Sequence, residues 1–217
     1  YVAQAKQQVA GAVGVPSAFT GPSEVVVVAD GTSPAEFTAT DLVAQAEHGP
    51  DGMSWLVTWS ETVADAVDAA LDRVLEDAPR GAEIAGTLAS SGHCVLVDDE
   101  QQALAVVDAI APEHLQLMVA DAEILAERVC NAGAVFLGPW TPTSIGDYVA
   151  GPSHVLPTAG TARFAGALTV ADFTKDVNLV TADPDALRRL GPHIEALAVA
   201  EGLEAHAESI RVRRQHG

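Results

Sequence analysis

The sequence predicts a doubly wound α/β fold, in which an incomplete Rossmann-like, mostly parallel sheet is followed by a C-terminal helical tail. The first observation is that short apolar runs alternate with segments of helical periodicity, a pattern typical of successive β–α units. The second is that a strand predicted over residues 24–30 holds a continuous apolar run rather than an alternating one. Such a strand is buried on both faces, as the strands of a parallel sheet are.

Local patterns indicate the individual elements. Helical periodicity over residues 3–13 comes before the first strand. After that strand, Ser33, Pro34 and Glu36 fit a capping box at a helix start, and Gly49-Pro50 ends this helix after about residue 48. The later predicted elements are a strand at 54–58, helices at 61–76 and 82–90, a strand at 94–97, a helix at 100–110, a strand at 115–119, a helix at 122–130, a strand at 134–137 and a helix at 184–212.

The chain divides into three predicted parts. Residues 1–22 form a helix and linker of a truncated preceding domain, and residues 23–168 form the Rossmann-like domain with most metal-binding and catalytic residues. Residues 169–217 form the helical tail, a candidate for exchange within a dimer. Residues 138–160 are rich in glycine and proline, and long loops in compact domains are usually functional.

Composition excludes several classes of function. Eleven basic against thirty acidic side chains give a net charge of −19, which repels nucleic acids and anionic lipids. Apolar runs are far shorter than the roughly 18 residues of a membrane-spanning helix. Cys94 and Cys130 lack the spacing of a disulfide framework or thiolate metal site, so we expect both to be small buried hydrophobes. We also expect a cytoplasmic location and, since the chain begins at Tyr1 without an initiator Met, a longer parent protein.

Two short motifs offer catalytic or metal-binding groups. Gln45 and His48 are three residues apart at the end of a predicted helix, so they share one face and can hold one metal ion. The alternative is that His48 only interacts with the helix dipole. Glu113-His114 follows a turn and precedes an apolar strand, where the two side chains can act as a general acid and base.

Further candidates lie later in the chain. Asp147 and His154 occur in the Gly/Pro-rich loop, although loop carboxylates often cap turns instead. Glu201 and His206 would point apart on an unbroken helix, and Gly202 can break it and bring them together. Gln45, His48, Asp147 and His206 together offer nitrogen and oxygen donors suited to zinc. No dinucleotide, P-loop or nucleophile-elbow motif is present, so no cofactor-binding residue is predicted in this chain.

Several motifs in order resemble the zinc-dependent histidinol dehydrogenase family over nearly the whole chain. They are Thr20-Gly21-Pro22-Ser23-Glu24-Val25, Gln45-Ala46-Glu47-His48-Gly49, Ala111-Pro112-Glu113-His114-Leu115, Asn131-Ala132-Gly133, Gly146-Asp147-Tyr148, His154-Val155-Leu156-Pro157-Thr158 and Glu201-Gly202-Leu203. Since members of the family are about twice as long, the chain resembles their C-terminal half.

The resemblance implies an enzyme of histidine biosynthesis that oxidises L-histidinol to L-histidine through L-histidinal, with two hydride transfers to NAD. It implies that His114 takes the hydroxyl proton and that Glu113 activates water for the second oxidation. The implied zinc ligands are Gln45, His48, Asp147 and His206. The implied substrate-binding residues are Ser23, Gln45, His48, His114, Asp147, Glu201, His206 and, as a neighbour of these, His154.

The resemblance also implies a homodimer with shared active sites, because in the family the tail bearing Glu201 and His206 comes from the neighbouring subunit. The NAD-contacting positions lie in the missing half, so we expect the chain to be inactive alone. Three alternatives stay open. The first is a dehydrogenase of another small alcohol on the same scaffold, and the second is an inactive half-length metal-binding module. The third is an acidic α/β domain whose His and Asp residues are surface or capping groups.

Overall fold

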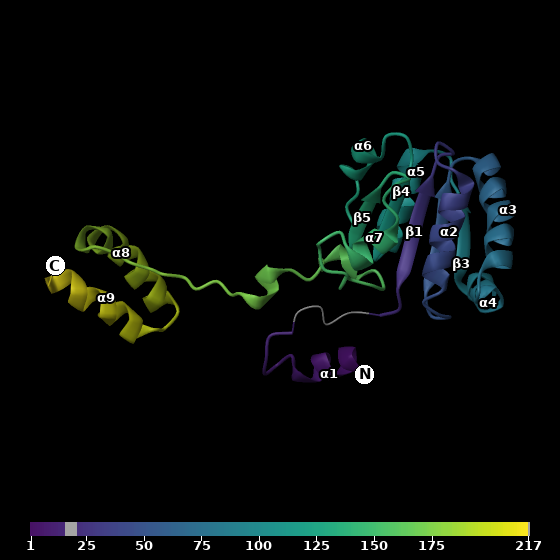
Figure 1. The fold of residues 1–217 in the computed structure, drawn as a ribbon. Coiled ribbons are helices and arrows are strands. Elements are labelled where there is room, and N and C mark those ends of the chain that lie inside the picture. Colours follow the sequence, from purple (N-terminus) through teal and green to yellow (C-terminus); the bar gives the residue numbers. More distant parts are fainter. Residues whose placement is uncertain (16–20, 217) are drawn as a thin grey trace. The chain divides into compact units, whose positions relative to one another are not determined.

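A computed structural model describes residues 1–15 and 21–216 of the chain (Figure 1). Residues 16–20, in the predicted linker of 1–22, lie outside the description. The chain forms two compact units, Tyr1–Thr174 and Lys175–Gly217. The three-part division made from the sequence stays a prediction. The elements are α1 (Val2–Val9), β1 (Glu24–Ala29), α2 (Ala35–Ala46), β2 (Met53–Thr58), α3 (Glu61–Asp77), α4 (Gly81–Ser91), β3 (Gly92–Leu96), α5 (Glu100–Ile110), β4 (His114–Met118), α6 (Ala122–Ala126), β5 (Ala134–Leu137), α7 (Thr143–Tyr148), two 3-10 turns (Thr161–Arg163 and Val170–Phe173), α8 (Pro184–Ala200) and α9 (Glu204–His216).

Within residues 21–216, five strands form one sheet in the order β3-β2-β1-β4-β5. Each neighbouring pair is parallel. The central strand β1 is buried along its whole length, and its Val25 pairs with Ser54 of β2 on one side and His114 of β4 on the other. The predicted α/β class with a parallel sheet is confirmed.

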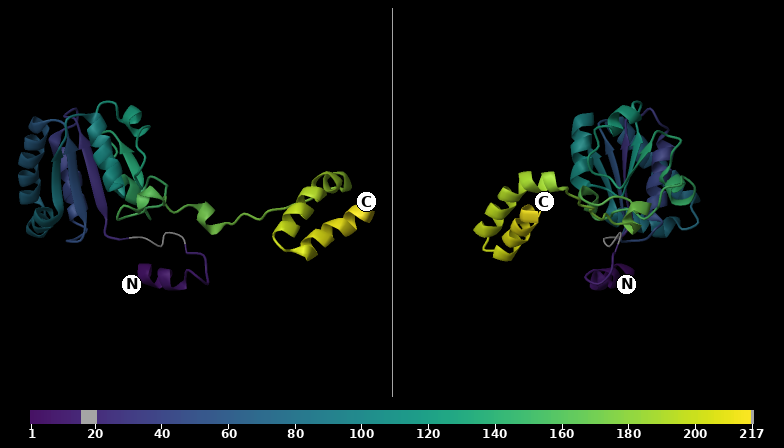
Figure 2. Two further views of the ribbon diagram at one scale, coloured as in Figure 1. Left: turned by 180° about the vertical axis from the view of Figure 1, so that it is seen from behind. Right: turned by 90° about the vertical axis from the view of Figure 1, so that its left-hand side faces the viewer.

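Helices cover both faces of this sheet (Figure 2). Side chains alternate along a strand, so Val25 and Val27 face α2 and α3, where they pack with Leu42 and Val67. The other face of β1 packs against α5 and α6 in a second cluster that contains Val26, Val28, Ala103, Leu104, Val107 and Leu125. Burial on both faces explains the continuous apolar run of β1.

Capping is seen at some helix starts and not at others. The Ser60 side chain accepts a hydrogen bond from the backbone N–H of Val63 at the start of α3. The predicted capping box at Ser33 is wrong: α2 begins after Pro34, and no side chain of the described residues caps it. Pro34 is extended at ψ 131°, so the chain enters α2 one residue later than a Ser33 cap requires.

Three other expectations need correction. The Gly/Pro-rich region contains the short helix α7, and α6 ends at Ala126 rather than near residue 130. Cys94 and Cys130 are both exposed free thiols rather than buried ones. Cys94 lies on the edge strand β3 and Cys130 follows the end of α6, so neither occupies a central layer.

The second unit is a helical hairpin of α8 and α9. The predicted break occurs at Gly202, whose φ of +74° ends α8 in the left-handed region that glycine adopts readily. Glu195 of α8 forms ion pairs with Arg211 at 3.4 Å and Arg214 at 2.6 Å of α9. The predicted apolar stripe of α8 is left largely exposed by this packing, with Leu197 67% exposed.

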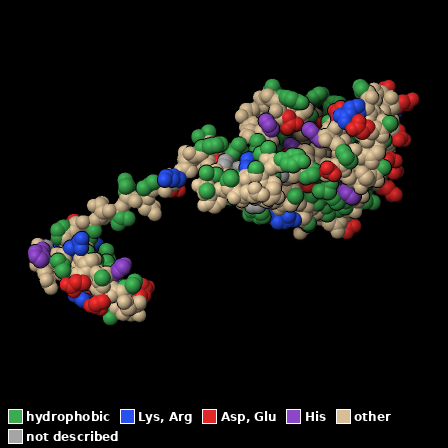
Figure 3. Space-filling view, turned by 90° about the horizontal axis from the view of Figure 1, so that it is seen from below, with side chains coloured by type: hydrophobic (Ala, Val, Ile, Leu, Met, Phe, Trp, Pro, Cys, Tyr) green, Lys and Arg blue, Asp and Glu red, His purple; other side chains and the backbone are tan. Residues whose placement is uncertain are grey.

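Helix α3 is the helix richest in exposed acidic side chains. Figure 3 shows acidic side chains gathered at the end of the first unit that is formed by α3. The exposed acids of this helix are Glu61, Asp65, Asp68, Asp72, Glu76 and Asp77. In the described part of the chain, no helix is both long and apolar enough to cross a bilayer.

Candidate functional site

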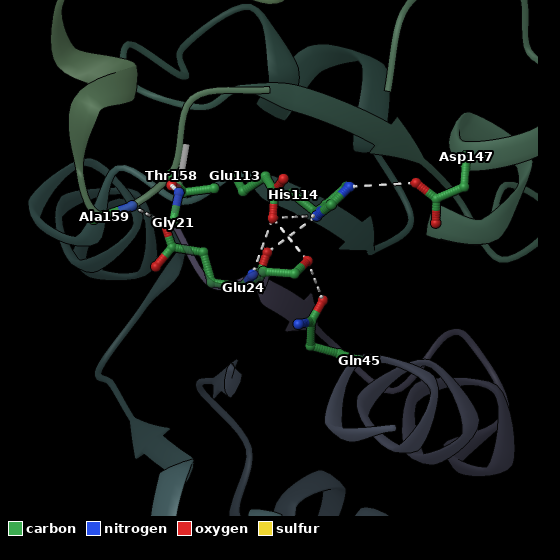
Figure 4. Close-up of polar contacts among 9 residues, drawn as sticks. Gly21, Glu24, Gln45, Glu113, His114, Asp147, Thr158 and Ala159 are labelled. Atoms are coloured by element: carbon green, nitrogen blue, oxygen red, sulfur yellow. Dashed lines mark hydrogen bonds and ion pairs between the residues drawn. The ribbon is translucent and has the colours of Figure 1, made fainter. Parts of the chain in front are cut away.

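Four predicted site residues of the first unit converge at the amino ends of the central strands, namely Gln45, Glu113, His114 and Asp147 (Figure 4). Ser23 immediately precedes β1, and His114 is the first residue of β4. Because β1 and β4 are adjacent and parallel, their amino ends lie side by side. Helix α2 runs back after β1, so Gln45 in its last turn and His48, two residues after its end, return to the same ends of the strands.

Glu113 and His114 form a buried pair. Their side chains are 10% and 7% exposed, and His114 Nδ1 lies 3.4 Å from Glu113 Oε2. The chain reaches this position through Ala111, which ends α5 in a left-handed conformation at φ 54°, and through Pro112, which cannot continue a helix. Gly133 then allows close approach, since a Cβ atom there would lie 2.6 Å from the Glu113 carbonyl oxygen.

The imidazole of His114 is held in one orientation. Its Nδ1 lies 3.1 Å from the backbone carbonyl oxygen of Glu24, so Nδ1 carries the proton and donates it there. The other nitrogen, Nε2, faces Asp147 Oδ1 at 3.9 Å. Burial lowers the pKa of His114, but hydrogen bonding and charge attraction from Glu113 outweigh it and raise the pKa above its usual value. Nε2 is therefore the basic atom of the pair.

Ser23 connects this pair to Gln45. The Ser23 hydroxyl lies 2.7 Å from Glu113 Oε2 and 3.2 Å from Gln45 Oε1. One hydroxyl proton cannot serve both acceptors, and the shorter bond goes to the carboxylate. Among the described residues the buried Gln45 Nε2 has no hydrogen-bond partner. Turning the amide by 180° lets its NH2 donate to Ser23 and leaves its carbonyl oxygen free of hydrogen bonds.

A cavity of about 290 Å³ brings the candidate metal ligands of this unit together. It is lined by Gln45, His48, His114 and Asp147, with Thr143, Ser144 and Tyr148 of α7. The freed amide oxygen, an imidazole and a carboxylate form a donor set that fits Zn²⁺. In the part of the chain that the structure describes, no three His, Cys, Asp or Glu side chains form a metal-binding group by themselves. A metal here therefore depends on the Gln45 amide or on a further ligand.

The remaining predicted residues are placed differently. His154 is exposed and lines a second cavity of about 270 Å³, which also contacts His114 and Asp147. Glu201 and His206 belong to the second unit, where Glu201 ends α8 and His206 lies in the first turns of α9. Both are exposed.

Two buried carboxyl groups near the site were not predicted. Glu24 is 2% exposed and Asp41 is 8% exposed. Burial raises the pKa of Asp41 to about 6, and a hydrogen bond from Gln116 opposes this in part. A sequence signal exists for each, because Glu24 borders a valine run and Asp41 lies one helical turn before Gln45, on the buried face of α2.

Fold and site together define a class: a doubly wound α/β domain with a buried Glu–His pair and a cavity of nitrogen and oxygen donors at the amino ends of its strands. The model of the histidinol dehydrogenase family matches residues 1–214. The chain belongs to the histidinol dehydrogenase family.

Individual relatives agree with this assignment. Histidinol dehydrogenase of Nitrobacter winogradskyi is 49% identical over 213 residues, which are 98% of this chain and 49% of the relative. The Thermus thermophilus protein is 46% identical over 99% of this chain and 52% of its own length. The crystal structure of histidinol dehydrogenase from Elizabethkingia anophelis covers the whole chain and 50% of its own chain, with a TM-score of 0.92 and 35% identity. The chain thus spans about half the length of the curated relatives it matches.

Proposed function

We propose that the protein carrying this chain oxidises L-histidinol to L-histidine through L-histidinal, and that each of the two steps passes a hydride to NAD. The observation that carries the proposal is the His114 imidazole, whose Nδ1 is held by the Glu24 carbonyl oxygen while Nε2 faces the donor-lined cavity. An imidazole held in this way is suited to accept the proton of an alcohol. The family assignment supplies the substrate class.

The chain's own residues perform the proton transfers. In the first step His114 Nε2 takes the hydroxyl proton while the carbinol carbon loses hydride, which leaves an aldehyde. In the second step Glu113 takes a proton from water as the water oxygen adds to the aldehyde carbon, and the resulting hydrate anion loses hydride to NAD and becomes the acid. Ser23 donates to Glu113 at 2.7 Å and so fixes the carboxylate that performs this step.

Metal binding is part of the proposal. Gln45, His48 and Asp147 would hold Zn²⁺, with His206 as the fourth protein ligand. When bound, the ion would anchor the substrate's amino and imidazole nitrogens and so orient its alcohol. The C-terminal end of α2 favours a cation at this position, because the helix dipole is negative there.

We also propose that the chain is the C-terminal half of a homodimeric enzyme. The partner subunit's tail would supply Glu201 and His206 to each site. The exposed apolar stripe of α8 supports this arrangement, since such surfaces normally pack against another element. The NAD-binding residues would then lie in the other half, and the isolated chain would be inactive.

The decisive experiment is calorimetry of Zn²⁺ and histidinol binding on two proteins. One is this chain, and the other is the chain joined to the amino-terminal half of the Nitrobacter relative. We expect only the longer protein to bind stoichiometric zinc and histidinol, and to lose both on His48→Ala. His93→Ala on the edge strand β3 is the matched control and should retain both. If the longer protein binds zinc but not histidinol, the proposed metal site is supported and the proposed substrate is wrong. If the isolated chain reduces NAD, the proposal that it is inactive alone is wrong.

A further inference from the structure

Glu24 is a buried acid that the proposed reaction does not use. It begins β1, its exposed fraction is 2%, and the next five residues are Val25, Val26, Val27, Val28 and Ala29. Burial raises its pKa and the nearby Glu113 carboxylate adds to the effect, whereas hydrogen bonds from backbone N–H groups lower it. A carboxyl group in such a place is costly to bury unless it binds several donors.

Backbone N–H groups of two segments that are distant in sequence act on this carboxyl group. Glu24 Oε1 accepts a hydrogen bond from the backbone N–H of Ala159 at 2.9 Å, and the backbone N–H groups of Gly160 and Glu113 also lower the pKa of the carboxyl group. Ala159 and Gly160 both have positive φ, 53° and 73°, so the chain makes a left-handed turn here, and from this turn the Ala159 N–H reaches the Glu24 carboxyl group. The left-handed conformation of Ala159 is strained for a residue with a side chain and needs such support.

The backbone of Glu24 contacts both residues of the Glu113–His114 pair. Its N–H donates to Glu113 Oε2 at 3.1 Å, and its carbonyl oxygen accepts from His114 Nδ1 at 3.1 Å. The backbone of Glu24 therefore binds both members of the pair (Figure 4). Next to it, the Gly21 N–H donates to the Thr158 hydroxyl, which ties the same turn to the start of β1.

We propose that Glu24 is a positioning residue for the reacting pair: its carboxyl group clamps the start of β1 to the Ala159–Gly160 turn, and so sets where the Glu24 backbone holds the Glu113 carboxylate and the His114 imidazole. The inference rests on the proposed function for its catalytic consequence. The clamp itself requires neither substrate nor metal, so it can be tested separately.

The test uses the full-length protein, made by joining this chain to the amino-terminal half of the Nitrobacter relative. Glu24→Leu roughly keeps the side-chain volume but removes both carboxylate oxygens. Glu24→Gln keeps one oxygen as an acceptor and places an NH2 group where the second oxygen was. Asp30→Ala is the matched control. Asp30 follows the other end of β1 and also accepts a distant backbone N–H, that of Ala120 at 2.8 Å, but it is remote from the reacting pair.

Two readouts are measured on the folded protein. Amide hydrogen exchange at Ala159 and Gly160, without metal or substrate, should quicken at least tenfold in Glu24→Leu and less in Glu24→Gln. For histidinol and histidinal, kcat should fall by about 100-fold in Glu24→Leu with little change in KM, as expected for misplaced reacting groups. Glu24→Gln should lie between Glu24→Leu and wild type, and Asp30→Ala should keep the wild-type kcat.

The outcomes separate the two proposals. The positioning role would be overturned if Glu24→Leu and Glu24→Gln showed the same exchange rates and the same kcat as Asp30→Ala. Such a result is expected of a residue that is needed only for packing. If Glu24→Leu does not fold, Glu24→Gln alone decides between these results. If wild type oxidises no histidinol but Glu24→Leu still loosens the turn, the proposed function is wrong and the clamp stands.

Discussion

Asp41→Asn is expected to stabilise the first unit, although it alters a buried group close to the site. Asp41 lies on α2 and is 8% exposed, and burial raises its pKa from 3.8 to about 6. Its neighbour Gln116 is fully buried, and among the described residues Gln116 Oε1 has no hydrogen-bond partner. An asparagine carries no charge, and its NH2 can donate to that oxygen while its carbonyl oxygen accepts from Gln116 Nε2.

The magnitude follows from proton linkage. The folded state holds the proton of Asp41 up to a pH of about 6, whereas the unfolded chain releases it near pH 3.8. The stability from neutral Asp41 is therefore full below pH 3.8 and is lost as the pH rises through about 6. This difference of about two pH units, at 1.36 kcal/mol per unit, is about 3 kcal/mol of unfolding free energy. Asparagine keeps this stability at every pH.

Urea unfolding at two pH values measures the effect. Asp41→Asn should raise the free energy of unfolding by about 3 kcal/mol at pH 8, and by about half as much at pH 5, where folded Asp41 is mostly protonated. The exposed Asp98→Asn serves as the control for a change of net charge. A destabilised Asp41→Asn protein, or a gain of the same size at both pH values, would refute the reasoning.

Three further predictions follow from single contacts. Gly133→Ala should lower the free energy of unfolding by about 2 kcal/mol or more in urea, since its Cβ would lie 2.6 Å from the Glu113 carbonyl oxygen; wild-type stability would show that the backbone there yields easily. NMR titration of the metal-free protein should give His114 a pKa above 6.5 that falls in Glu113→Gln, because Glu113 raises it; an unchanged value would contradict that cause. Ser60→Ala should cost about 1 kcal/mol in the same urea assay, because it removes the 3.3 Å bond from Val63 N–H, and no loss would mean that water replaces the cap.

The parallel sheet could be predicted because its evidence is local. A continuous run such as Val25–Val28 is stable only when both faces are covered, and the structure covers β1 with α2 and α3 on one face and α5 and α6 on the other. The short helix α7 could not be predicted in the same way. Its six residues include Gly146, which lies close against Phe136 of β5, so a contact distant in sequence selects the helix.

The errors have a similar origin. Cys94 has a hydrophobic sequence neighbourhood, but β3 is an edge strand and its middle residues are exposed. An edge position depends on strand order, which hydrophobic periodicity does not contain. Ser33 has the right neighbours for a cap, yet the extended Pro34 delays the helix by one residue.

The candidate site was predictable as separate motifs but not as an assembly. Helical spacing places Gln45 and His48 on one face, and Glu113-His114 stands out at a turn. Their meeting depends on β1 and β4 being neighbours, which follows from the sheet order alone. The roles of the Ser23 hydroxyl and of the Glu24 carboxyl group depend on bonds across about 90 and 135 positions of sequence, which no local pattern records.

The site lies at the amino ends of the strands, and this position explains which kind of ligand suits it. Doubly wound domains usually bind phosphate-bearing ligands at the carboxyl ends of their strands, where helix N-termini favour anions. At that end of β1, the Asp30 carboxylate already accepts the N–H groups of Ala120 and Thr32. The candidate site lies at the opposite, amino ends of the strands, where the electronegative C-terminal end of α2 lies beside Gln45 and His48. The helix dipole and the donor set therefore both favour a cation there, in line with the proposed metal.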